Sequence, residues 1–381
     1  MLTLLLLQPG LRAPLTPAQT LLTPEMLRTI ELASVEGPAV AVIAGSDQSA
    51  GEIAVVCAPG KCEAVEWAAK KLGPAITAKQ LPRPARTIRV VQSATTPARD
   101  TRAAIFVGES KGRHLRIVRG AWSTANIADE VVEVFARQAV TTFEAGSYES
   151  AGQPQWEALG IPVTTVIPPA DASDLDRTSF VAAASAYFLA TLPNAGSEAL
   201  LSLLMVGAHA RLAEDGRRAV AMMGVQQRAS GEVLTMFANA IDREQRRIGS
   251  FERFMPAPVD AMLHSRIVDM QKDITGVWSS IGITPSPFVP PAERIRGRGG
   301  EDRRIPARLS AEPLPKVELP TAFLKFDNVD VIVQELGNFI DGKRSISDIR
   351  DAVSSEFTSI ALPVVVEYFE RLARAGAISL K

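Results

Sequence analysis

The sequence is poor in the residues that build metal and redox sites. Its 381 residues include three histidines, His114, His209 and His264, and two cysteines, Cys57 and Cys62. No histidine has a second histidine or cysteine at a zinc-motif spacing, and the cysteines form neither a Cys-x-x-Cys redox pair nor half of a tetrahedral zinc site. We therefore expect two free, mostly buried thiols, histidines at packed or surface positions, and no cofactor.

The sequence also lacks long apolar runs, an excess of one charge and the common catalytic motifs. Its apolar start, Leu2 to Leu7, is too short to cross a bilayer and has neither the basic residues nor the cleavage site of a secretory signal. A net charge of −1 gives no general attraction to nucleic acid or to anionic membranes. No Gly-x-Ser-x-Gly elbow, phosphate loop or dinucleotide fingerprint occurs. These features predict a cytoplasmic protein that binds neither nucleic acid nor membrane.

Composition and hydrophobic spacing divide the chain into five regions. They are an N-terminal extension and helix at 1–37, an α/β domain at 38–195, a helical region at 196–281, a Pro- and Arg-rich exposed linker at 282–322, and a winged-helix-like module at 323–381. The helix of the first region is expected to start after Thr23, whose hydroxyl can cap it ahead of Pro24. The apolar faces within 197–245 are expected to be core, partly against the α/β domain or a partner subunit.

The α/β region alternates strand-like and helix-like stretches, which predicts an α/β fold class. Val40–Ile43 and Ile53–Val56 are expected to form a hairpin across Gly45-Ser46-Asp47. A helix from Lys61 to Leu72 is expected to stop at Gly73-Pro74. Further strands are expected at 86–91, 103–107, 115–118 and 163–167, and further helices at 127–139 and 178–192.

Several short segments follow one another in a familiar order. They are Ile53–Cys57, Arg86–Arg89, Phe106–Glu109, Gly146-Ser147 and Gly160–Val163. Over about 38–192 this order resembles the bacterial zinc aminopeptidase family, whose superfamily includes glutaminyl cyclase and the transferrin receptor. Versions of that family with an added winged-helix-like module also resemble residues 323–381. The resemblance implies a reduced α/β/α sandwich of the zinc-aminopeptidase type, followed by a helical region and the small C-terminal module.

The resemblance also implies where a two-zinc site would lie, and this chain has lost the residues that would form it. Such a site needs five carboxylate or imidazole ligands and a glutamate base. The matching positions hold Ala58-Pro59-Gly60, Gln92 to Pro97, Ile105-Phe106, Tyr148-Glu149 and Ile167 to Asp171, so all five ligands and the base are missing. We assign no catalytic residue. The emptied cleft is expected to be lined by Ala58, Pro59, Gly60, Ser93, Ala94, Glu109, Tyr148, Glu149 and Asp171.

The C-terminal module is expected to run helix, turn at Asp341-Gly342, helix, helix and short strand, with Ser345 as an N-cap and Gly376 ending the last helix. From Phe326 to Lys381 there are six Lys or Arg and nine Asp or Glu, a net charge of −3. A DNA-binding surface needs positive charge to neutralise phosphates. The module is therefore expected to contact protein rather than DNA.

Two functions follow from these observations. The first is a non-catalytic, aminopeptidase-like binding or assembly subunit that pairs with itself or with an intact homologue, or that holds a peptide in the old cleft. The second is a metal-independent hydrolase or peptide-modifying enzyme with a rebuilt site, for which Glu109, Glu149, Asp171 and Asp174 are the nearby carboxylates. Loop carboxylates are usually just solvated, which favours the first function.

Overall fold

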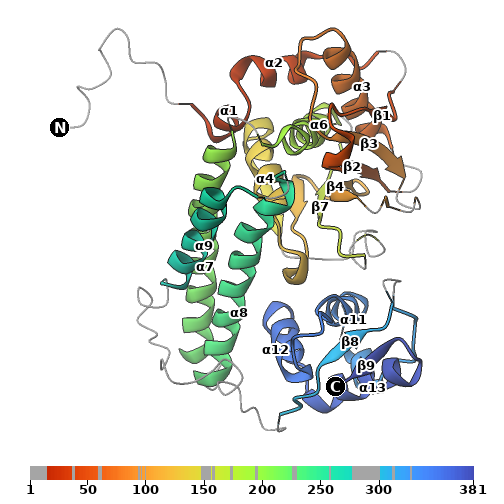
Figure 1. Cartoon of the computed structure of the whole chain (residues 1–381), viewed down its shortest axis with the longest axis vertical. Coiled ribbons are helices and arrows are strands. Elements are labelled where there is room, and N and C mark those ends of the chain that lie inside the picture. Colours follow the sequence, from red (N-terminus) through yellow and green to blue (C-terminus); the bar gives the residue numbers. More distant parts are fainter. Residues whose placement is uncertain are drawn as a thin grey trace, which may run out of the picture.

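The computed structural model describes residues 15–36, 39–58, 62–92, 95, 97–98, 100–146, 156, 159–171, 175–193, 196–224, 230–256, 259–276, 301–310, 314–326 and 328–381. These residues form a seven-stranded sheet, a group of long helices and a C-terminal module (Figure 1). The expected α/β fold class is confirmed.

The sheet is mixed and has the strand order β1-β3-β2-β4-β7-β5-β6. The strands are β1 (Val42–Ile43), β2 (Glu52–Cys57), β3 (Thr87–Gln92), β4 (Thr101–Val107), β5 (Leu115–Val118), β6 (Phe143–Gly146) and β7 (Val163–Ile167). β3, β2, β4 and β7 are parallel, whereas β1 and the β5–β6 pair are antiparallel to the strands they adjoin. The carboxyl ends of β2, β4 and β7 therefore share one edge of the sheet, and β5 ends at the opposite edge.

The expected hairpin is wrong because β3 lies between its two strands. Val42 of β1 pairs with Arg89, while β2 pairs in parallel with β3 from its other side. The segment expected to be the hairpin turn contacts the start of β3 instead: Ser46 N–H donates to the Pro84 carbonyl at 2.9 Å. Gly45 is required there, because a Cβ would lie 2.4 Å from the Ala85 carbonyl oxygen. Adjacency in sequence suggested a pairing that a non-local strand prevents.

One face of the sheet is covered by helices α3 (Glu63–Thr77), α4 (Ile127–Ala139) and α6 (Leu175–Thr191), with α1 (Pro17–Leu21) and α2 (Pro24–Leu32) outside them (Figure 1). Successive side chains of a strand point to opposite faces of the sheet, so Ile53 and Val55 pack in the core on the face covered by helices. On the other face Ala54 and Val56 belong to a smaller cluster around Trp156. Helix α6 is buried on almost every side, and this explains why its sequence is Ala-rich and apolar along its whole length.

The remaining expected elements of this domain are found where the patterns put them, apart from the end of α3. Thr23 caps α2 by accepting from Met26 N–H at 3.3 Å. Helix α3, however, continues through Gly73 and Pro74 to Thr77. Proline costs one helical hydrogen bond, and the buried Leu72 and Ala75 stabilise the helix on either side of it. At Gly73 a Cβ would lie 2.8 Å from Val40 Cγ2, so this glycine serves close packing rather than a stop.

The helical region contains α7 (Ser197–Gly224), α8 (Ser230–Gly249), the 3-10 helix η4 (Ser250–Phe254) and α9 (Ala261–Thr275). The apolar face of α7 is core as expected, with Leu200, Leu201 and Leu204 fully buried. Helix α8 packs against α7, α9 and a helix of the C-terminal module, and so links the parts of the chain (Figure 1). No helix in the described part of the chain is long and apolar enough to cross a membrane.

The C-terminal module has the expected order of elements: α11 (Val329–Asn338), α12 (Ile346–Glu356), α13 (Leu362–Arg374) and β9 (Ile378–Leu380). Ser345 caps α12, and Gly376 adopts a φ of 72° after α13. The short η6 (Thr321–Lys325) precedes these helices, and Phe323 in it is buried.

Part of the expected exposed linker belongs to this module. Strand β8 (Pro306–Arg308) pairs antiparallel with β9, and the Arg304 carbonyl accepts from Ile346 N–H at 2.9 Å. The arginines of this stretch are paired locally, because Arg304 binds both Asp302 and Glu370. The mixed charges that suggested a solvated linker instead stabilise a two-stranded sheet.

The expectation of free thiols is wrong. Cys57 ends β2 and Cys62 precedes α3, their Cα atoms lie 5.1 Å apart, and the two form a disulfide. A spacing of four intervening residues gave no sign of this pairing. Disulfides are rare in reducing compartments such as the cytoplasm, so this bond is at odds with the expected cytoplasmic location.

We predict that the purified chain, denatured without reductant, presents no titratable thiol, and presents two after reduction. A six-residue loop lets the bond contribute at most about 2 kcal/mol to stability through the unfolded chain. Cys57→Ser with Cys62→Ser should therefore lower the free energy of unfolding by no more than that. Two reactive thiols in the untreated denatured protein would contradict the assignment.

Candidate functional site

The ends of β2, β4 and β7, which the resemblance assigns to metal binding, come together. The end of β6, which precedes the expected cleft residues Tyr148 and Glu149, does not, because β6 is parallel to β5 and ends at the opposite edge. Ala58 N–H donates to the Val107 carbonyl at 3.1 Å, and Lys111 N–H donates to the Pro168 carbonyl at 2.9 Å, so the loops after β2, β4 and β7 adjoin. Ala58 is buried, whereas Glu109 and Asp171 on these loops are exposed. The other expected cleft residues lie outside the described residues: Pro59, Gly60, Ser93, Ala94, Tyr148 and Glu149.

The three histidines lie on three different elements, and of these only the loop after β4, which carries His114, is at this edge. His114 is exposed on the loop after β4, and His209 is exposed on α7 with Nδ1 2.8 Å from the Met205 carbonyl. His264 on α9 lies 2.5 Å from Glu252. Within the described ranges, no three His, Cys, Asp or Glu side chains gather as a metal site would require.

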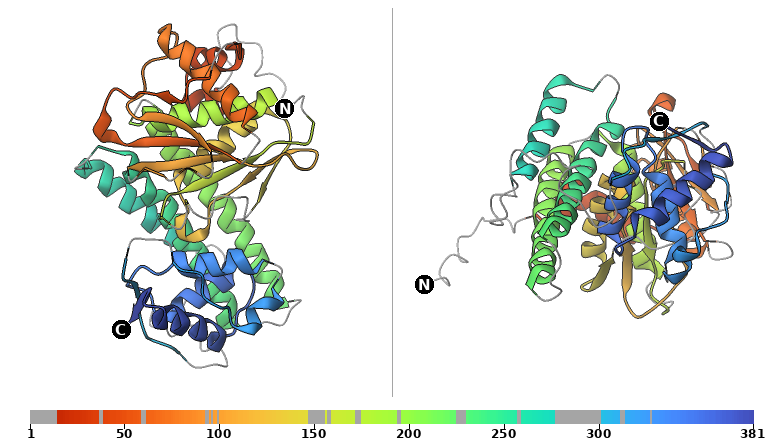
Figure 2. Two further views of the ribbon diagram at one scale, coloured as in Figure 1. Left: turned by 90° about the vertical axis from the view of Figure 1, so that its right-hand side faces the viewer. Right: turned by 90° about the horizontal axis from the view of Figure 1, so that it is seen from below.

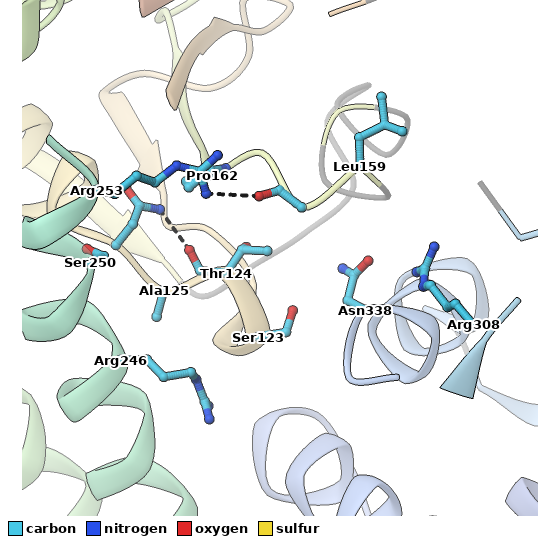
Figure 3. Close-up of a pocket in the computed structure, with 12 residues that line it drawn as sticks. Ser123, Thr124, Ala125, Leu159, Pro162, Arg246, Ser250, Arg253, Arg308 and Asn338 are labelled. Carbon is cyan, nitrogen blue, oxygen red and sulfur yellow. Dashed lines mark hydrogen bonds between the residues drawn. The ribbon is translucent and has the colours of Figure 1, made fainter. Parts of the chain in front are cut away.

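A pocket of about 510 Å³ lies at the opposite edge of the sheet (Figure 3). One wall is formed by residues 123–126, after β5, and another by Leu159, Gly160 and Pro162, before β7. Arg246, Ser250 and Arg253 come from α8 and η4, while Arg308 and Asn338 come from the C-terminal module. Three separate parts of the chain therefore build one cavity, and its volume is that of a typical small-molecule site.

Arg253 enters the pocket from η4, which is anchored by the buried Phe251 and Phe254. Its guanidinium donates to the carbonyls of Gly160 and Thr101, each at 3.2 Å. Among the described residues it has no carboxylate partner. Burial and the nearby Arg102 lower its pKa, because both oppose the charged form.

Arg246 lies one turn before the end of α8 and reaches the same cavity. Its Nε donates to the Trp122 carbonyl at 3.1 Å, another of its nitrogens pairs with Asp242, and its guanidinium stacks over Phe339 of the module. Burial lowers the pKa of Arg246, partly offset by Asp242.

The module contributes Arg308 from β8 and Asn338 from the end of α11. Arg308 donates to the Gly337 carbonyl at 3.0 Å, and burial lowers its pKa. In Figure 3, Arg308 and Asn338 lie across the cavity from Arg253 and Ser250. Among the residues that the structure describes, the lining thus includes three arginines and no carboxylate.

A buried ion network holds the walls of the pocket in place. Glu244 of α8 accepts from Arg211 of α7 at 2.9 Å and from Arg247 at 3.0 Å, and it also pairs with Arg243. Arg247 reaches Asp129 of α4 at 3.0 Å, and Asp129 accepts from Gly120 N–H and from the Thr164 hydroxyl. Burial would raise the pKa of Glu244, but Arg247, Arg211 and Arg243 outweigh burial and hold the pKa well below its ordinary value.

The C-terminal module contacts the 3-10 helix η2 (Trp122–Thr124) through two of the module's own glutamates, both of them buried. Trp122 N–H donates to Glu356 at 3.2 Å, and Ser123 donates to Glu335 from its backbone at 2.7 Å and from its hydroxyl at 2.6 Å. Asn338, which lines the pocket, donates to the same Glu335. Burial, and then the neighbouring Glu335, raise the pKa of Glu356 well above its ordinary value, which favours the neutral carboxyl in the docked module.

The sequence reasoning missed this site. Arg243, Arg246, Arg247 and Arg253 fall within the twelve residues before Phe254. This local density of arginine was a signal that the sequence reasoning did not use. No protein-family model and no curated protein matches the chain.

We predict that docking of the module weakens as the pH rises. Below its ordinary value of 4.5, Glu356 is protonated in both states. Above that value the unfolded carboxyl releases its proton while the docked one retains it, so stability is lost up to the folded pKa. Asp351, whose pKa burial raises to about 7, acts in the same direction.

Glu356→Gln keeps the acceptor for Trp122 and removes this titration. At pH 8 the variant should therefore be more stable than the native chain, because the native carboxyl must be desolvated or kept protonated there and the amide need not. The two should converge near pH 4.5 in urea unfolding. Glu367→Gln on the exposed part of α13 is the matched control. Equal stability of the native chain and Glu356→Gln at both pH values would show that Glu356 is not a buried neutral carboxyl.

Proposed function

We propose that this chain is a non-catalytic binding protein. In this proposal its sheet is a reduced member of the zinc-aminopeptidase type, and its winged-helix-like module serves protein and ligand contact rather than DNA. The proposal is supported at the end of β2, where the resemblance calls for a His-x-Asp pair. That position is filled by buried Ala58 beside the Cys57–Cys62 disulfide.

The pocket at the opposite edge is the observation that carries the proposal. It is built jointly by the α/β domain, the end of α8 and the module. Its arginines are held by backbone carbonyls, an ion pair and an aromatic ring. Its lining has no nucleophile–base pair: Ser250 Oγ is committed to the Ile127 N–H and the Arg247 carbonyl. Such an arrangement holds a ligand in place, but offers no group to transform it.

The second proposed role is assembly with another copy or with an intact homologue. A fold whose chemistry is lost can persist as a binding scaffold. Light scattering on the purified chain tests this role separately from ligand binding. A monomer without any co-purifying partner would leave ligand binding as the function.

The alternative, a rebuilt enzyme, places its chemistry at the emptied edge. Glu109 and Asp171 are its described carboxylates, and both are exposed. Exposed loop carboxylates are usually just solvated, which favours the binding function over this alternative.

We predict that the chain neither retains zinc at one or more equivalents after dialysis nor hydrolyses aminoacyl anilides, with or without added zinc. Two-metal catalysis needs ligands that fix both ions, and the matching positions lack them. Metal analysis and a chromogenic assay against an active zinc aminopeptidase provide the test.

Stoichiometric zinc together with anilide hydrolysis would overturn the proposed function. Zinc-independent hydrolysis that is lost in Glu109→Gln or Asp171→Asn, and kept in the exposed control Glu214→Gln, would establish the rebuilt enzyme instead.

A further inference from the structure

We propose that the arginine pocket binds a small organic anion that carries at least two phosphate or carboxylate groups, and that this anion fastens the C-terminal module to the α/β domain. The inference rests on the proposed binding function and adds the class of ligand. Its basis is the pocket itself: three guanidinium groups from three segments, with no carboxylate among the lining residues that the structure describes.

The charge of the pocket is only partly balanced. Arg246 is paired with Asp242, whereas the partners of Arg253 among the described residues are the carbonyls of Gly160 and Thr101. Arg102 adds a further positive charge near Arg253. Confining cations in a partly buried space is unfavourable unless an opposite charge enters. An anionic ligand supplies that charge, whereas a neutral or cationic ligand does not.

The donor chemistry fits oxyanions. Guanidinium presents planar pairs of N–H groups that match carboxylate and phosphate oxygens. The Arg253 contacts use two of its five N–H groups, so the remaining donors are available to a ligand. Asn338 contributes an amide to the wall on the module side.

The placement of the arginines indicates more than one acidic group. Figure 3 shows Arg253 and Arg308 on opposite sides of the cavity, attached to η4 and β8. A ligand with acidic groups at two ends reaches both, and a volume of about 510 Å³ suits a small molecule rather than a protein segment. Because the two arginines belong to separate parts of the chain, the bound anion would join those parts.

Isothermal titration of the full chain at constant ionic strength tests the inference. The probes are diphosphate, citrate, inorganic phosphate and uncharged glucose. Diphosphate or citrate should saturate one site, bind at least about tenfold more tightly than inorganic phosphate, and raise the unfolding temperature. Which of the two binds more tightly distinguishes phosphate from carboxylate ligands. Glucose should not bind.

Variants assign the binding to the pocket. Arg253→Gln and Arg308→Gln should each lower the binding affinity for diphosphate or citrate, whichever binds more tightly, by about tenfold or more, because each removes a charge-assisted contact. Arg253→Lys and Arg308→Lys keep the charge and should lose less. The matched control is Arg113→Gln, at an exposed position on the loop after β4, which should bind as the native chain does. Circular dichroism confirms that each variant is folded.

The inference is overturned if neither diphosphate nor citrate saturates, or if folded Arg253 and Arg308 variants bind as tightly as Arg113→Gln. Failure here is separable from failure of the proposed function. Anilide hydrolysis by a chain whose pocket still binds diphosphate would overturn only the proposed function, whereas a chain that neither binds nor hydrolyses would overturn only this inference.

Discussion

Glu244 is the group on which the arrangement of this molecule depends. It is fully buried at the meeting of α7, α8 and α4, and three arginines, Arg211, Arg243 and Arg247, donate to it. A buried carboxylate is tolerated only when charge and hydrogen bonds compensate its lost hydration. The cluster is also non-local: Arg247 passes the contact on to Asp129, and through it to the loop after β5 and to β7. The sheet and the long helices are thus joined by polar contacts of defined geometry as well as by apolar packing.

That join determines where the pocket can form. With α8 fixed by Glu244 and Arg247, its last turn and η4 present Arg246 and Arg253 at the sheet edge opposite the carboxyl ends of β2, β4 and β7. The module packs beside α8 and beneath the sheet domain (Figure 2), where Glu335 and Glu356 bind the backbone of η2. The proposed binding surface is therefore this junction between the sheet, α8 and the module.

The sequence predicted local elements well and long-range contacts poorly. Strands 115–118 and 163–167 and helix 127–139 are found as expected, because their hydrophobic periods and caps are local. The hairpin at 40–56 failed because β3 inserts from thirty residues further along the chain, which no local pattern records. The prediction of an exposed linker failed at β8 for the same reason, because β8 pairs with β9, which lies some seventy residues further along the chain. The pocket is the extreme case: Arg253, Arg308 and Ser123 are brought together only by tertiary structure.

Urea unfolding of Glu244→Gln compared with Glu214→Gln tests the central claim most directly. Both changes remove one carboxylate from the helical region, but Glu214 is exposed and pairs with a single arginine. Removing the buried carboxylate leaves Arg211, Arg243 and Arg247 with one carboxylate partner each among the described residues, Glu130, Asp215 and Asp129. The loss of the shared buried partner should cost about 3 kcal/mol, whereas the exposed change should cost less than about 1 kcal/mol. Equal, small losses in the two variants would contradict the account, because they would show that the sheet and helices do not depend on the Glu244 cluster.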